Sequence, residues 1–239
     1  MTTTTPPGRP DDGWTIVVPV KTLDRAKSRL TPALDPQARR ALVLAMATDV
    51  LDTCLATDGV ARVRVVTDDP AVATLARDRG VDVVADPPSR AAADLLNPAL
   101  AAALATAPGP VGVVTADLPE LRPEHLARIL RAAARHPHAA LPDHRGTGTT
   151  MAFWTVGVVG PARIPRFGTD SASRHLHEGG AASLSDADPS GAAARDVDTP
   201  ADLAGLSPAR VGDATAAVLE ALAGTHPPHV ADVSVTMVP

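Results

Sequence analysis

The sequence predicts an α/β protein whose mostly parallel central sheet is flanked by helices. Over the first 135 residues, short runs of apolar, β-branched residues alternate with segments of helical apolar spacing. This alternation indicates βαβ units with right-handed crossovers. Hydrophobic residues make up 45% of the 239-residue chain, enough for a sizeable core. We expect one domain at 14–224, a disordered lead-in at 1–13, and a tail at 225–239 that is an edge strand or disordered.

The expected elements begin with a buried strand at residues 14–20, which Pro19 brings to an end. Asp35-Pro36 starts the first helix, because an acidic N-cap followed by proline in the first turn is a favoured helix start. Asp69-Pro70 and Thr199-Pro200 repeat that signal for two later helices. Further strands are expected at 63–67, 81–85, 111–115, 139–141 and 151–159, and further helices at 91–106, 122–135, 171–178 and 213–223.

Composition and charge exclude several classes of protein. The net charge is −5, and the chain has no Tyr, two Trp and two Phe, so neither a basic nucleic-acid surface nor a base-stacking platform is indicated. No run approaches the about 18 apolar residues of a membrane span, and the start lacks a secretion-signal pattern. The single cysteine, Cys54, excludes a disulfide framework and a cysteine-built zinc site. We therefore expect a cytoplasmic protein with no membrane and no nucleic acid among its partners.

A basic segment follows the first expected strand. Lys21 and Lys27 are the only lysines of the chain, and Arg25 and Arg29 complete four cations within nine residues. Charge-assisted hydrogen bonds from such side chains suit a triphosphate. The alternative is an ordinary solvated helix face. The segment contains no glycine, so it is neither a P-loop nor a dinucleotide fingerprint.

Three aspartates form a candidate metal site. Asp117 follows the strand expected at 111–115, and Asp196 and Asp198 share one face if their segment is extended. One or two carboxylates together with substrate phosphates commonly hold Mg²⁺. The alternative makes Asp198 a helix-start residue and Asp196 a surface residue, and the residues alone do not decide between the two readings.

Two glycine-containing loops could bind an anion. The loop at 146–150 (GTGTT) offers backbone N–H groups and hydroxyls, although it also suits an ordinary hairpin. The segment 167–171 (FGTDS) leads into a helix, where Asp170 or Ser171 could simply be the N-cap. The histidines, including His144 and His175, lack the accompanying ligands that a zinc site needs.

Five ordered segments carry a resemblance to a known family. They are VPVKTLDRAKSRL (18–30), TADLPEL (115–121), DHRGTGTTM (143–151), RFGTDSASRH (166–175) and DVDTPADL (196–203). Together they resemble the phosphoenolpyruvate or 2-phospho-L-lactate guanylyltransferases of coenzyme F-420 biosynthesis, over roughly residues 14–210.

The resemblance implies a nucleotidyltransferase fold of the glycosyltransferase-A type. It implies that GTP and a phosphorylated three-carbon acid react to give a guanosine diphosphate diester and pyrophosphate, with Mg²⁺ as cofactor. By the same resemblance, Lys21, Lys27 and Asp117 are the expected catalytic residues. Asp117, Asp196 and Asp198 form the metal site; Thr149, Gly168 and Ser171 contact the acid; Lys21, Lys27, Arg29 and Asn97 contact the nucleotide.

Several alternatives stay open at this point. Phosphoenolpyruvate is preferred to 2-phospho-L-lactate only because the alanine- and arginine-rich composition resembles that of actinobacterial proteins. A molybdopterin-type nucleotidyltransferase usually carries a glycine-rich first loop, which this chain lacks. A non-catalytic nucleotide-binding module is the remaining alternative. Transfer of the product to the next enzyme and a homodimer are expectations that the sequence does not decide.

Overall fold

A computed structural model describes residues 13–85, 96–155, 158 and 160–225. The predicted disordered lead-in lies, except for Gly13, outside the described residues, as does the tail beyond Thr225. None of the helices in the described ranges combines the length and apolar character needed to cross a membrane.

The described strands form one seven-stranded sheet in the order β3-β2-β1-β4-β6-β5-β7. All pairings are parallel except those of β6, which runs antiparallel to β4 and β5. The strands are β1 (Trp14–Pro19), β2 (Val60–Thr67), β3 (Asp82–Ala85), β4 (Val111–Val114), β5 (His138–Pro142), β6 (Thr149–Trp154) and β7 (Ala182–Ser183). The predicted mostly parallel α/β fold is confirmed.

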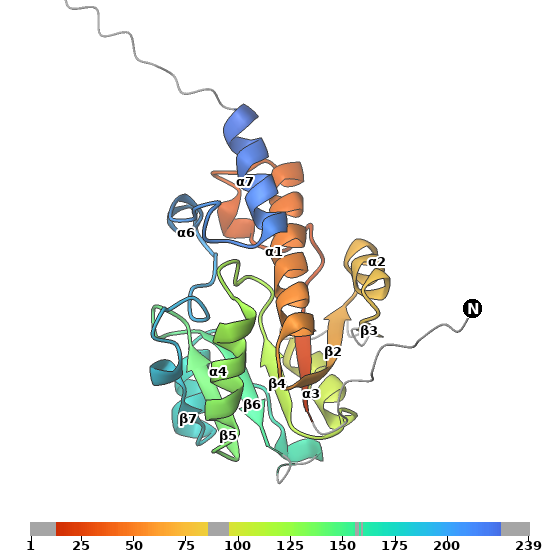
Figure 1. Cartoon of the computed structure of the whole chain (residues 1–239), viewed down its shortest axis with the longest axis vertical. Coiled ribbons are helices and arrows are strands. Elements are labelled where there is room, and N and C mark those ends of the chain that lie inside the picture. The colour runs from red at the N-terminus through yellow and green to blue at the C-terminus, as the bar shows by residue number, and fades with distance from the viewer. Residues whose placement is uncertain (1–12, 86–95, 156–157, 159, 226–239) are drawn as a thin grey trace, which may run out of the picture.

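Helices cover both faces of this sheet (Figure 1). The main helices are α1 (Pro36–Ala56), α2 (Pro70–Asp78), α3 (Leu96–Ala105), α4 (Pro123–Ala133) and α7 (Asp213–Thr225), and α5 (Ser171–Ser173) and α6 (Pro200–Ala204) are short. Buried residues of α1, α2 and α4 form one core cluster with β1, whereas α3 packs in a second cluster. Ile16 and Val18 belong to the first cluster and Val17 to the second, so β1 is buried on both faces.

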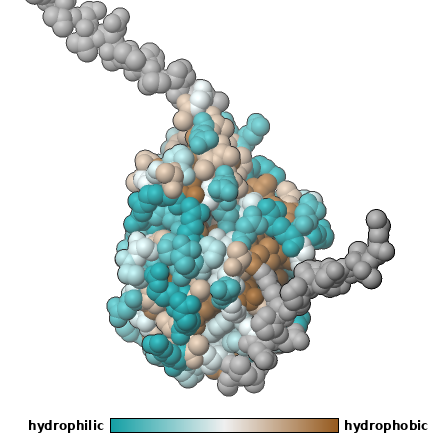
Figure 2. Space-filling view, in the orientation of Figure 1, coloured by the Kyte–Doolittle hydropathy of each residue, from teal (hydrophilic) through white to brown (hydrophobic). Residues whose placement is uncertain are grey.

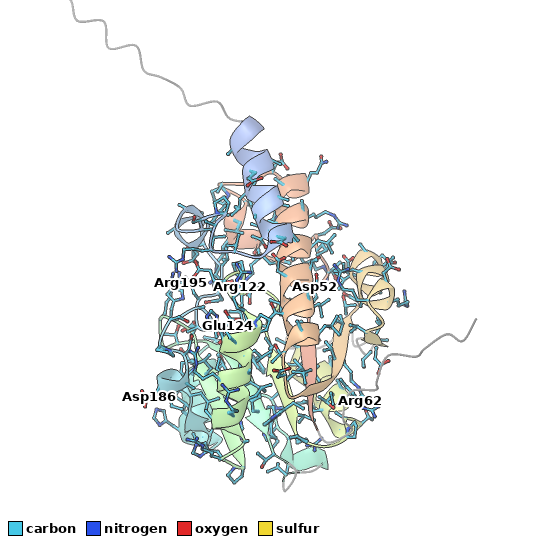
Figure 3. The ribbon with its side chains drawn as sticks, viewed as in Figure 1. Asp52, Arg62, Arg122, Glu124, Asp186 and Arg195 are labelled. Carbon is cyan, nitrogen blue, oxygen red and sulfur yellow. The ribbon has the colours of Figure 1, made fainter. Side chains whose placement is uncertain are left out.

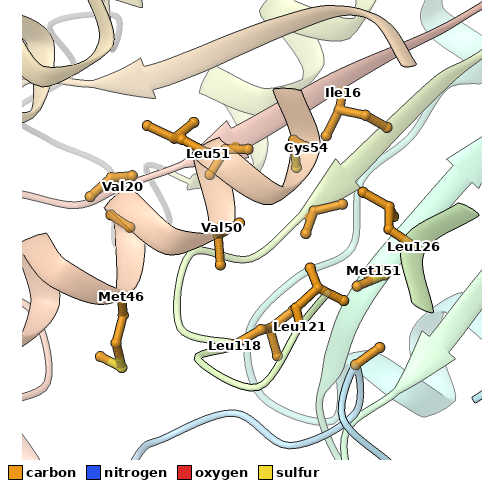
Figure 4. Packing of buried hydrophobic residues seen from close by; sticks show 14 of the residues in the cluster. Ile16, Val20, Met46, Val50, Leu51, Cys54, Leu118, Leu121, Leu126 and Met151 are labelled. Carbon is orange, nitrogen blue, oxygen red and sulfur yellow. The ribbon is translucent and has the colours of Figure 1, made fainter. Parts of the chain in front are cut away.

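The larger cluster also anchors the loop that follows β4. Figure 4 shows Met46 and Val50 of α1 beside this loop, whose Leu118 and Leu121 are almost completely buried. Met151 of β6 completes the contact region. Asp117 directly precedes Leu118, so this apolar packing fixes the backbone that carries a candidate site residue.

Most helix starts agree with the sequence signals. The side chains of Asp35, Asp69 and Thr199 accept hydrogen bonds from the first turns of α1, α2 and α6. The helix at 122–135 appears as α4, and its charged outer side contributes to the hydrophilic surface in Figure 2. Of the helix predicted at 91–106, residues 91–95 lie outside the described residues and the rest forms α3.

Three elements differ from the sequence prediction. The strand predicted at 151–159 instead spans Thr149–Trp154, because the last part of the glycine-threonine loop pairs with β5. The two-residue strand β7 was not predicted, being too short for a periodic pattern. The predicted helix at 171–178 consists of α5 followed by a π-helical turn, Arg174–Glu178.

The last described helix is attached to α1 by a partly buried carboxylate contact. α7 lies beside α1 (Figure 1). Asp49 accepts hydrogen bonds from the backbone N–H groups of Ala214 at 3.0 Å and Thr215 at 2.8 Å. Asp49 therefore caps a helix that is distant in sequence, which satisfies two of its orphan donors.

We expect Asp49→Ala to lower the free energy of unfolding by about 1 kcal/mol, the usual cost of a lost cap. Amide hydrogen exchange should accelerate in α7. Asp52→Ala, one turn along α1 (Figure 3), is the matched control, because Asp52 makes only a surface ion pair with Arg79. Urea unfolding that shows equal losses for both variants would contradict this assignment.

Candidate active site

The candidate site is a cavity at the carboxyl ends of β1 and β4. The chain runs from β1 outward to β3 and then crosses back to β4 on the other side of β1. Open α/β sheets bind ligands at such a switch point. The cavity has a volume of about 730 Å³. Every residue proposed from the sequence lines it except Asn97: Lys21, Lys27, Arg29, Asp117, Thr149, Gly168, Ser171, Asp196 and Asp198.

The three aspartates converge although Asp117 lies 79 residues before Asp196 in the sequence. The backbone N–H of Val197 donates to the carbonyl of Asp117 at 3.2 Å and holds the two acidic segments together. One carboxylate oxygen from each of Asp117, Asp196 and Asp198 lies within 4.8 Å of the others. The capping box of α6 supports Asp198, whose backbone N–H donates to Asp202 at 3.0 Å.

Lys27 donates hydrogen bonds to both Asp117 and Asp198. Its side chain is only 13% exposed, and its backbone has a left-handed φ of +52°, which is uncommon for a residue other than glycine. Arg29 is peripheral, because its Nη1 lies 3.9 Å from Asp198 and its side chain is 76% exposed. Lys21 is exposed at the rim of the same cavity.

This grouping leaves an excess of negative charge. Burial raises the pKa of Asp117, but the Lys27 ammonium outweighs that effect and lowers it below its ordinary value. Burial opposes the charge on Lys27, yet Asp117 and Asp198 raise its pKa above the ordinary range. Burial and the charges of Asp117 and Asp198 raise the pKa of Asp196. One ammonium among three carboxylates is therefore not enough to neutralise them.

The donor set fits a divalent cation. Asp117 Oδ1 and Asp196 Oδ1 are buried and have no hydrogen-bond partner in the described part of the molecule. His144 Nδ1 lies 3.4 Å from Asp196 Oδ1 without forming a hydrogen bond. Buried oxygens without partners are costly, and hard oxygen ligands are those that Mg²⁺ prefers.

Arg39 and Asp69 hold the basic segment in place. Arg39 on α1 is 9% exposed and donates to the backbone carbonyls of Asp24, at 2.9 Å, and of Ala26. Asp69, at the start of α2, accepts from the backbone N–H of Leu23 at 2.9 Å. These two charged side chains bind backbone atoms, so they fix the path of the loop that presents Lys27.

The glycine-threonine loop is folded around an internal anion. Asp143 accepts hydrogen bonds from the backbone N–H groups of Arg145, Thr147 and Gly148 at 2.9–3.1 Å. A Cβ at position 148 would lie 2.5 Å from the Asp143 carboxylate, which explains the glycine. Two of the N–H groups that the sequence offered to a ligand, those of Thr147 and Gly148, are therefore bound by the Asp143 side chain.

Thr149, Gly168 and Ser171 line one wall of the cavity, on the β6 side of β4, whereas Lys27's loop follows β1 on the other side of β4. The backbone N–H of Ala172 donates to the carbonyl of Thr147 at 3.1 Å and joins the two loops. Gly168 has a φ of +113°, a conformation that other residues rarely adopt.

Asn97 does not line the cavity. Its amide instead exchanges two 2.8 Å hydrogen bonds with the backbone N–H and carbonyl of Phe167. Asn97, which lies on α3, therefore holds the turn at residues 166–168 in place. A contact between Asn97 and the nucleotide stays a prediction, because these two hydrogen bonds join its side chain to the backbone of Phe167.

Sequence reasoning missed His175. It is completely buried, and its ring contacts both Thr149 and the 166–171 segment. From the sequence, His175 was a candidate only as a metal ligand, and its helical spacing from Ser171 is the one signal that could have indicated these contacts.

A family model described as guanylyl transferase CofC like matches residues 14–220. The chain belongs to this family. A phosphoenolpyruvate guanylyltransferase from Geodermatophilus obscurus is 44% identical over 212 residues, covering 86% of this chain and 94% of that protein. One from Salinispora arenicola is 47% identical over 206 residues, covering 85% and 92%.

The solved structures support the fold. A protein from Desulfovibrio desulfuricans, provisionally named a nucleotide-diphospho-sugar transferase, matches with a TM-score of 0.62 and 16% identity over 88% of this chain and 95% of that one. The nucleotidyltransferase fold that the family resemblance implied is confirmed.

Burial lowers the pKa of His175 to about 4, and the neighbouring His138, Arg166 and Arg174 act in the same direction. In the unfolded chain the ring takes up its proton near pH 6.5, whereas in the folded protein it does so only near pH 4. The unfolded state therefore binds more protons between these values, and stability falls as the pH is lowered through this window.

Because of His175, we expect the free energy of unfolding of the wild type to fall by about 2 kcal/mol when the pH is lowered from 7 to 5. His175→Gln cannot titrate and should show a correspondingly shallower pH dependence in urea unfolding. His177→Gln, at an exposed position, is the matched control. Parallel curves for the wild type and His175→Gln would show that His175 does not titrate as the structure requires.

Proposed function

We propose that this protein is a guanylyltransferase that joins GTP to phosphoenolpyruvate, releases pyrophosphate, and serves coenzyme F-420 biosynthesis. The observation that carries the proposal is the junction of the Asp117–Asp196–Asp198 cluster with Lys27 in a cavity of about 730 Å³. The names of relatives at 44–47% identity support this choice of substrate.

Asp117 and Asp196, with Asp198 beside them, are the residues proposed to hold Mg²⁺. When bound, the ion would offset phosphate charge and orient the reacting groups. The reaction forms a bond between a phosphate oxygen of the acid and the α-phosphorus of GTP, and the bond from that phosphorus to pyrophosphate breaks. The attacking phosphate is already ionised at neutral pH, so no general base is required.

The two walls of the cavity then have separate tasks. Lys21, Lys27 and Arg29 bind the triphosphate and stabilise the charge that develops on departing pyrophosphate. Thr149, Gly168 and Ser171 bind the phosphorylated acid on the other wall. Both substrates are anions, so holding them in line against their mutual repulsion accounts for much of the rate.

Purified protein incubated with GTP, Mg²⁺ and phosphoenolpyruvate should release pyrophosphate and form a nucleotide of the expected mass. Asp117→Asn should lower turnover at least about 100-fold, because a carboxylate that binds the metal is lost. Asp186→Asn, on the exposed surface (Figure 3), should retain activity. Faster reaction with 2-phospho-L-lactate would change the assigned acid, and no release with either acid would refute the proposal.

Lys27 is expected to exchange partners during binding. It now pairs with Asp117 and Asp198, which are also proposed metal ligands, so the ammonium and the cation compete for the same carboxylates. An arriving triphosphate supplies Lys27 with new anionic partners. Nucleotide and metal should therefore bind cooperatively.

Lys27→Met should raise the affinity for Mn²⁺ without nucleotide by roughly tenfold or more, since a competing positive charge is removed. The same variant should bind GTP more weakly. Isothermal titration calorimetry measures both affinities. Lys21→Met is the matched control, and should weaken GTP binding while leaving Mn²⁺ binding nearly unchanged. Weaker Mn²⁺ binding by Lys27→Met would exclude the competition.

A further inference from the structure

His175 connects the two segments that form the acid-binding wall. Its Nδ1 lies 3.2 Å from the Thr149 hydroxyl of β6 and 3.0 Å from the Ser171 carbonyl of α5. On the other side of the ring, Nε2 accepts a hydrogen bond from the backbone N–H of Arg166 at 3.1 Å. One side chain thus contacts both ends of the 166–171 turn and a residue of the neighbouring strand.

These hydrogen-bond partners define which nitrogen of the His175 ring carries the proton. A backbone N–H can only donate, so Nε2 carries no proton and Nδ1 does. The Nδ1–H then donates toward the Ser171 carbonyl, with the Thr149 hydroxyl beside it. The ring is neutral and both of its nitrogens are in use, so it offers no proton and no metal ligand to the cavity.

Aromatic packing prevents the ring from turning. Phe167 lies edge-on at 5.1 Å between ring centroids, and His138 lies at 5.9 Å. His138 is itself stacked on Trp154 at 4.8 Å. The π-helical turn Arg174–Glu178 places His175 in this position. A single π-turn within a short helix is an irregularity that often marks a functional segment.

We propose that His175 is a positioning residue that sets the distance between Thr149 and the 166–171 turn, and thereby the affinity for the phosphorylated acid. This inference rests on the proposed function, in which Thr149, Gly168 and Ser171 bind that acid. His175 lies behind these residues and does not line the cavity. Its effect should therefore concern the acid and not the nucleotide.

The test compares three variants in steady-state kinetics with GTP and phosphoenolpyruvate varied separately. His175→Phe keeps an aromatic ring against Phe167 and His138 but removes every hydrogen bond. We expect its KM for phosphoenolpyruvate to rise about tenfold, with the KM for GTP changed less than twofold. His175→Gln, which can still accept from Arg166, should recover part of the loss. His177→Phe, at an exposed site, should match the wild type.

Three results would overturn the role of His175. They are an unchanged KM for phosphoenolpyruvate, an equal rise in both KM values, and a loss of thermal stability with both KM values unchanged. If His175→Phe does not fold, His175→Gln decides by the same criterion, a selective rise in the KM for the acid. Absence of wild-type turnover with either acid would instead refute the proposed function, so the two failures are distinguishable.

Discussion

The contact of Lys27 with Asp117 and Asp198 is the interaction on which the rest of the site depends. Three carboxylates within 4.8 Å of one another would repel strongly in a partly buried place, and one ammonium relieves only part of that repulsion. The remaining charge and the buried oxygens of Asp117 and Asp196, which have no hydrogen-bond partner among the described residues, fit the cluster to a divalent cation. The rest of the fold therefore has to hold the three carboxylates together against their mutual repulsion.

The sheet topology and the packing of the core hold the residues of this cluster together. Asp117 follows β4 on a loop fixed by Leu118 and Leu121, and Lys27 lies on a loop after the neighbouring β1. The segment carrying Asp196 and Asp198 is tied to Asp117 by a backbone hydrogen bond. Arg39 and Asp69 bind backbone atoms of residues 23–26, so the chain is held in place directly before the left-handed Lys27. Most of these supporting contacts are made by groups outside the cavity.

The sequence predicted those features that depend on local chemistry. The Asp-Pro and Thr-Pro starts of α1, α2 and α6 were found because a cap needs only neighbouring residues. Lys21, Lys27, Arg29 and Asp117 were candidates because they follow parallel strands, whose carboxyl ends meet at one edge of the sheet. Thr149, Gly168 and Ser171 were assigned to the acid from the family resemblance. The contacts of Asp143 are local, but the pattern of the 146–150 loop does not show that a neighbouring carboxylate binds its N–H groups. The sequence placed Asn97 in the nucleotide pocket and offered His175 only as a possible metal ligand, because their contacts with the 166–171 segment follow from the tertiary fold. β7 was missed for the same reason: its two residues are a strand only because β5 lies beside them.

The wall lined by Thr149, Gly168 and Ser171 differs from the side of the cavity with Lys27 and the aspartates in how charge is distributed. Asp143 lines the cavity close to Thr149, and its negative charge would repel an anionic substrate if it were bare. Three backbone N–H groups surround that carboxylate and spread its charge. His175 and Asn97 hold the adjacent turn as neutral side chains, so they add no net charge to this side of the cavity. The Arg174 guanidinium, whose Nη1 donates to the Phe167 carbonyl at 3.5 Å, is a charged contact with the same turn. The hydrogen bonds of His175 and Asn97 therefore fix the geometry of the turn, and the charge beside it is a cation, which suits the anionic acid proposed to bind there.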